Sequence, residues 1–189
     1  MDKNQLTGLF EAISLSEAYI LVILLILSCV LQNLYLLLVL GLLFTKHLPE
    51  QILKRLSNYF GWNIGNRPIG ARNCNSLNAG GLANSSGLVS GHVFNMTSLT
   101  FFLLYKFTEN DKKPNAREIT LLCFMYAFIY ALMTARVNLL CHTKEQVIIG
   151  FLLGIAWGYV MFVTANAIIK TSPRLQEDEK RINAFLNGC

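Results

Sequence analysis

Two arginines and two histidines lie in short polar blocks of an otherwise apolar chain. Arg67, His92, Arg136 and His142 belong to the blocks 66–72, 87–92 and 136–146. An arginine guanidinium matches phosphate oxygens in bidentate fashion, and a neutral imidazole is a good nucleophile towards phosphorus. The three blocks therefore point to a site where a phosphate group is bound and attacked.

Ser90 and Gly91 stand directly before His92, at the expected start of a helix. The Ser90 hydroxyl and the Gly91 amide can donate to an anion there, and the helix dipole favours negative charge at that end. Glycine also lets the backbone approach phosphate closely. The Gly- and Asn-rich segment 61–91 is typical of a loop that wraps an anion.

The blocks resemble, in order, the three motifs of the type-2 phosphatidic-acid-phosphatase superfamily, which also includes vanadium haloperoxidases. The family pattern is Lys-x6-Arg-Pro, then Pro-Ser-Gly-His, then Ser-Arg-x5-His-x3-Asp. The residues that match it are Arg67, Pro68, Ser90, Gly91, His92, Arg136 and His142. The resemblance extends over residues 34–169, with a looser likeness to a branch in large DNA viruses related to dolichyl-pyrophosphate phosphatases.

The resemblance implies a role for each matching residue. His142 would attack phosphorus and form a phosphoenzyme, while His92 would protonate the leaving oxygen and then activate water. The substrate phosphate would be bound by Arg67, Ser90, Gly91 and Arg136. No metal or cofactor is expected, because the arginines supply the positive charge. The implied substrate is a membrane lipid phosphate or an isoprenoid diphosphate.

The chain departs from the family pattern at the first motif. The family lysine would fall at Phe60. Arg72 in the same loop, or Lys54 further upstream, is a candidate for the missing charge and for binding phosphate. Val89 and Ala135 also replace the family proline and serine.

The third motif lacks its aspartate, whose position is taken by Gln146. The Gln146 amide oxygen can accept a hydrogen bond from His142, but it cannot stabilise an imidazolium as a carboxylate does. The adjacent Glu145 is the alternative orienting residue. These losses leave open a rival interpretation: a weakened relative that binds lipid phosphate or acts as a membrane scaffold. A small transporter and a haloperoxidase are further alternatives.

The composition predicts an integral membrane protein. Of 189 residues, 53% are hydrophobic and only 14% are charged, which is too apolar for a soluble exterior. We expect an all-α bundle of about five transmembrane helices with a polar active-site loop. The expected helices are 18–31, 34–60 with a break near Pro49, 92–107, 119–140 and 144–169. The first would be retained as an anchor rather than cleaved.

The distribution of charge predicts topology. The net charge is +5, but the basic residues gather in the loop 106–117 and after residue 169, beside apolar segments. The positive-inside rule places those regions in the cytoplasm and argues against a nucleic-acid partner. The candidate site then faces the non-cytoplasmic side. We divide the chain into a membrane phosphatase domain, 1–170, and a charged, partly helical cytoplasmic tail, 171–189.

Small residues and cysteines give two further expectations. Gly150, Gly154 and Gly158 recur every four residues, a spacing that allows close helix packing in lipid. Cys74 and Cys141 share the predicted non-cytoplasmic side, and a disulfide between them is a hypothesis. The cysteine spacings do not resemble a zinc site.

Overall fold

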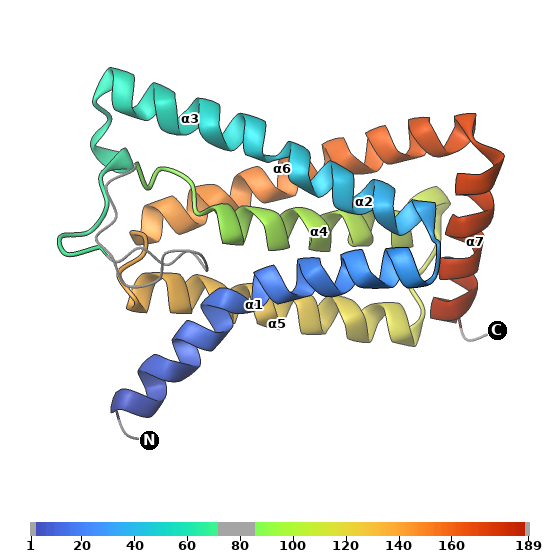
Figure 1. Ribbon diagram of the computed structural model, residues 1–189, viewed down its shortest axis with the longest axis horizontal. Coiled ribbons are helices and arrows are strands. Elements are labelled where there is room, and N and C mark those ends of the chain that lie inside the picture. Colours follow the sequence, from blue (N-terminus) through green and yellow to red (C-terminus); the bar gives the residue numbers. More distant parts are fainter. Residues whose placement is uncertain (1–2, 72–85, 188–189) are drawn as a thin grey trace.

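The computed structural model describes residues 3–71 and 86–187, and within these ranges the chain is helical without a strand (Figure 1). The long helices are α1 (Lys3–Val30), α2 (Leu34–Thr45), α3 (His47–Phe60), α4 (Gly91–Phe107), α5 (Ala116–Asn138), α6 (Lys144–Thr171) and α7 (Pro173–Asn187). Two short 3-10 turns, η1 (Asn63–Gly65) and η2 (Glu109–Asp111), complete the described elements. The expected all-α bundle is confirmed.

Four stretches of the described chain are long and apolar enough to cross a membrane: Thr7–Val30, Leu34–Phe60, Ala116–Asn138 and Lys144–Thr171. The second combines α2 and α3. Helix α4 has only 17 residues but packs against α6, α5, α1 and α2, so it is the central helix of the bundle. Large apolar side chains are exposed on the outer helices, where lipid rather than water can solvate them.

The interruption expected between the helices 18–31 and 34–60 is confirmed, and it is a tight turn at residues 32–33. Gln32 adopts a positive φ of 49°, and the Asn33 side chain accepts a hydrogen bond from Leu36 N and caps α2. The break between α2 and α3 lies at Lys46, three residues before the expected position. Pro49 therefore falls in the first turn of α3, where the missing N–H leaves no helical hydrogen bond unmade.

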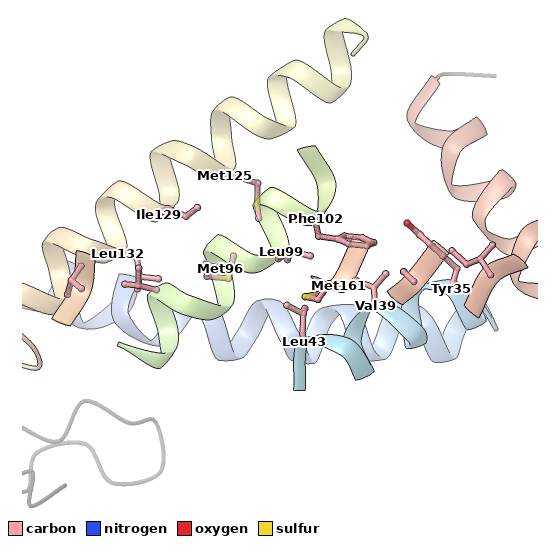
Figure 2. Packing of buried hydrophobic residues seen from close by; sticks show 14 residues of the cluster. Tyr35, Val39, Leu43, Met96, Leu99, Phe102, Met125, Ile129, Leu132 and Met161 are labelled. Atoms are coloured by element: carbon pink, nitrogen blue, oxygen red, sulfur yellow. The ribbon is translucent and has the colours of Figure 1, made fainter. Parts of the chain in front are cut away.

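The core lies between α4 and its neighbours, as Figure 2 shows. Helix α6 packs most extensively against α4. A Cβ atom added to Gly154 would lie 2.5 Å from Thr97 Cβ, and one added to Gly158 would lie 2.8 Å from Ser98 O. A Cβ on Gly150 would meet Ser90 O at 3.0 Å. The close packing expected from the glycine spacing is confirmed, and Gly150 brings this contact to the start of α4.

Helix α7 crosses the far end of the bundle (Figure 1). The Asp178 carboxylate accepts from Leu34 N at 2.8 Å, and Lys106 Nζ lies 2.5 Å from Glu179 Oε1. The tail thereby fastens the start of α2 and the end of α4. The division of the chain at residue 170 and the cytoplasmic placement of the tail stay predictions.

Substituting Gly158→Ala tests the close α4–α6 contact. The added methyl would press on backbone atoms of α4, which cannot move aside independently. We expect a loss of about 1–3 kcal/mol of unfolding free energy. The measurement is reversible unfolding in mixed detergent micelles. The matched control is Gly41→Ala in α2, where nothing lies within 4 Å of the new Cβ. Equal stability of the two variants would contradict the contact.

Candidate functional site

The sequence blocks that were singled out meet at the end of the bundle opposite α7. This end is formed by the C-terminal ends of α3 and α5, the N-terminal ends of α4 and α6, and the described part of the loop after α3 (Figure 1). His142, Arg136, Arg67 and Gln146 are joined there through short contacts. The structure therefore brings these residues together from segments that are distant in the sequence.

A tight turn brings His142 back onto Arg136. Helix α5 ends at Asn138, and Leu140 adopts a left-handed φ of 57°. The N–H groups of Cys141 and His142 then donate to Arg136 O at 3.0 and 3.2 Å. This capping arrangement reverses the chain, so that Arg136 Nη2 lies 3.4 Å from His142 Nε2. The five-residue gap between the two side chains is the length that this turn requires.

The His142 ring is buried and oriented through Nδ1. This nitrogen lies 3.2 Å from Gly87 O and 3.3 Å from Gln146 Oε1, both of which are acceptors. We therefore assign the proton to Nδ1, which leaves the lone pair on Nε2, facing Arg136. Burial lowers the pKa of His142 well below its usual value, and the charges of Arg136 and Arg67 lower it further. A neutral imidazole with a free Nε2 lone pair is the nucleophilic form.

Gln146 connects His142 to the loop before Arg67. Its Oε1 accepts from Thr143 N at 3.2 Å, as part of the capping box of α6, and its Nε2 donates to Ile64 O and Asn66 O at 2.9 and 2.7 Å. The side chain is fully buried. A carboxylate at this position could accept the bond from Thr143 N, but it could not donate to Ile64 O and Asn66 O. An amide is therefore the group that this site requires where the family pattern has aspartate.

Glu145 does not share this position. Its side chain is exposed and bonds to Thr143 rather than to His142. The structure therefore places only Gln146 beside the nucleophile, and the alternative orienting role of Glu145 has no contact to support it.

Arg67 approaches the same turn from the other side. Its Nη1 donates to Cys141 O at 2.6 Å. A Cβ atom added to Gly87 would lie 2.9 Å from Arg67 Cγ and 2.5 Å from Gln146 Oε1, so only glycine fits between these side chains. Cys141 is disulfide-bonded and fully buried. The predicted partner Cys74 and the candidate phosphate ligand Arg72 lie outside the described residues.

Ser90 and Gly91 form the start of α4. Ser90 is completely buried, its N–H donates to Gln146 O, and its hydroxyl makes no hydrogen bond within the described part of the chain. A buried hydroxyl without a partner is unfavourable by about 1–3 kcal/mol. A bound anion would satisfy it at a helix N-terminus. His92 follows, half-buried and within electrostatic reach of Arg136 and His142.

Helix α3 contributes a charged face that sequence reasoning recognised only in part. Lys46 Nζ donates to Gly91 O at 2.7 Å and lies 3.1 Å from Glu50 Oε2, while Lys54 Nζ lies 2.5 Å from Glu50 Oε1. A Cβ added to Gly91 would meet Glu50 Oε1 at 2.7 Å. Lys46, Glu50 and Lys54 recur every four residues, opposite an exposed apolar stripe formed by Leu48, Ile52 and Leu56. This pattern is the sequence signal that indicates the charged face.

Ser14 was missed entirely. Arg136 Nη1 donates to Ser14 Oγ at 2.7 Å, and both residues are buried. No motif includes this serine, and it precedes the expected first helix, 18–31, because the observed helix α1 already begins at Lys3.

Comparison with known families agrees with this geometry. The family model of the PAP2 superfamily matches residues 17–170. The chain therefore belongs to the PAP2 superfamily, a helical membrane fold whose members are phosphatases acting on phosphate esters, often of lipids. The resemblance stated from the motifs is confirmed, whereas the viral branch stays a prediction. No curated protein and no solved structure matches the chain.

Replacing Gln146 by glutamate tests whether the amide group is required. In Gln146→Glu a buried carboxylate would face the carbonyl oxygens of Ile64 and Asn66, with no hydrogen to donate. We expect a loss of about 1–3 kcal/mol of unfolding free energy. Detergent unfolding followed by tryptophan fluorescence measures it. Glu145→Gln is the control, since it makes the reverse exchange at an exposed neighbour. Wild-type stability of Gln146→Glu would contradict the assigned contacts.

Proposed function

We propose that the protein is a membrane lipid phosphatase that hydrolyses a lipid phosphate or an isoprenoid diphosphate through a phosphohistidine at His142. One observation carries the proposal: the buried His142 ring presents Nε2 towards the Arg136 guanidinium, while two acceptors hold its Nδ1–H. A phosphoryl group placed at this point would meet a nucleophile and a positive charge together.

The proposed reaction has two steps. The Nε2 lone pair of His142 attacks phosphorus, the ester P–O bond breaks, and His92 gives a proton to the leaving oxygen. In the second step His92 takes a proton from water, the water oxygen attacks phosphorus, and the P–N bond breaks. Inorganic phosphate leaves and neutral His142 is restored. His92 lies within electrostatic reach of Arg136 and His142, and the negative charge of a bound phosphate would favour the protonated form of His92 against those positive charges.

The positive charge of the site supports the binding of a phosphate. Arg67 and Arg136 lie beside His142, and Lys54 is within electrostatic reach of both imidazoles. Lys54 therefore offers the charge that Phe60 lacks in the first motif. The Ser90 hydroxyl, which has no partner among residues 3–71 and 86–187, and the N-terminus of α4 would add hydrogen-bond donors. No metal or cofactor enters the proposed reaction.

The proposed topology places this site on the non-cytoplasmic face. The basic residues Lys112, Lys113, Arg117 and Lys170 lie at the opposite end, as the positive-inside rule requires of the cytoplasmic side. The disulfide state of Cys141 suits an oxidising compartment. The apolar stripe of α3 faces outward beside the site, where the acyl or isoprenoid tail of a substrate could remain in the bilayer.

The proposal predicts how the two histidines differ. His142→Ala removes the nucleophile and should lower phosphate release from lipid phosphates in detergent by at least 10³-fold, as for a nucleophile in other covalent enzymes. His92→Ala should retain phosphate labelling of His142 with a substrate such as p-nitrophenyl phosphate, because that leaving group needs no proton. The label is trapped by denaturation at alkaline pH, since the P–N bond of phosphohistidine hydrolyses in acid.

Wild-type protein and Lys113→Gln, at the far end of the bundle, serve as references for this experiment. Equal and near-zero release from wild-type and His142→Ala would support the rival interpretation, a lipid-phosphate-binding or scaffold protein. Labelling that survives in His142→Ala would move the nucleophile to another residue.

The lowered pKa of His142 predicts the response to pH. A lowered pKa keeps the ring neutral and nucleophilic below pH 6.5, and protonation abolishes attack only at more acidic pH. Removing the Arg67 charge in Arg67→Gln should raise this pKa and move the acidic limb of kcat/KM up by about one pH unit. Arg55→Gln, which removes an exposed charge, should leave the limb in place. An unchanged limb in Arg67→Gln would contradict the electrostatic coupling.

A further inference from the structure

We infer that Ser14 of α1 is a positioning residue for the phosphate site, acting through the Arg136 guanidinium. The inference rests on the proposed function in one respect, namely that Arg136 binds the phosphate. Ser14 precedes the matched range 17–170, and no family motif includes it. The inference gives helix α1 a part in the chemistry of the site in addition to its part in the membrane bundle.

The geometry of the contact supports this role. Arg136 Nη1 donates to Ser14 Oγ at 2.7 Å, and Arg136 Nη2 lies 3.4 Å from His142 Nε2. The guanidinium is planar and rigid, so fixing one terminal nitrogen fixes the direction of the other. Ser14 is 2% exposed and Arg136 is also 2% exposed, so the hydrogen bond is shielded from water. Hydrogen bonds to charged groups are stronger than neutral ones, and more so when they are buried.

The contact with Ser14 gives α1 a role in orienting Arg136, although α1 and Arg136 are far apart in the sequence. Arg136 lies in the last turn of α5, where its long side chain could adopt several rotamers. Helix α1 packs along α5 (Figure 1). Ser14 is the point where a hydroxyl of α1 meets the guanidinium. In the bound state Nη2 would donate to a phosphate oxygen placed beside His142 Nε2, while Nη1 stays on Ser14. The serine thereby orients the charge before substrate arrives.

A second serine of the same helix provides a matched comparison. Ser28 is also buried, but its hydroxyl donates to Leu25 O within α1 and does not reach the site. Loss of the Ser28 hydroxyl therefore reports what removing a buried serine from α1 does to the fold alone.

Binding of orthovanadate, a phosphate analogue, tests the inference without requiring turnover. Wild-type, Ser14→Ala, Ser14→Thr and Ser28→Ala proteins are purified in detergent and titrated calorimetrically, and thermal unfolding is recorded for each. We expect Ser14→Ala to bind about 10-fold to 100-fold more weakly. Ser14→Thr keeps the hydroxyl and should bind within about threefold of wild-type, as should Ser28→Ala. The two alanine variants should unfold at similar temperatures.

Each outcome decides the matter. Wild-type affinity in Ser14→Ala would overturn the inference, as would a loss in Ser14→Ala that Ser28→Ala shares. Ser14-dependent binding by a protein that releases no phosphate from any lipid phosphate would refute the proposed function and leave the inference standing. Absence of vanadate binding by the wild-type protein would refute both.

Discussion

The guanidinium of Arg136 is a positive charge buried near the end of an apolar helix, and this constraint governs the rest of the site. Burying such a charge costs several kcal/mol unless hydrogen bonds and an opposite charge offset it. The protein supplies a hydroxyl from Ser14 and the ring of His142, both neutral groups. An incoming phosphate would bring a negative charge next to this guanidinium. The attraction between the two charges is strong because the site is shielded from water.

Gln146 replaces the aspartate of the family motif by an amide, and the amide forms contacts that a carboxylate could not form. An aspartate would stabilise a positive His142 ring, whereas the Gln146 amide accepts from that ring and also donates to two carbonyl groups of the loop before Arg67. One side chain thus sets the orientation of the nucleophile and the position of an arginine. The net charge of the site is consequently more positive with glutamine at position 146 than it would be with a carboxylate there.

Local signals made much of the fold predictable. The polar pair Gln32-Asn33 and the glycines of α6 act on near neighbours, so the sequence displays them directly. The motif residues of the site were predictable because they match the three family motifs in order. By contrast, the contact of Ser14 with Arg136 spans 122 residues, and the direction in which Glu50 points depends on how α3 is tilted against α4. Such contacts follow from tertiary packing, which no local pattern encodes.

The two ends of the bundle differ in a way that fits their assigned roles. At the far end, Lys106 bonds to Glu109, Asn166 and Glu179, so that α4, α6 and α7 are fastened by groups that satisfy one another. At the site end, the buried Ser90 hydroxyl has no partner among the described residues. A fold held rigidly at one end can tolerate such unmet hydrogen-bonding capacity at the other. That capacity, beside the start of a helix and two guanidinium groups, is what an oxyanion would complete.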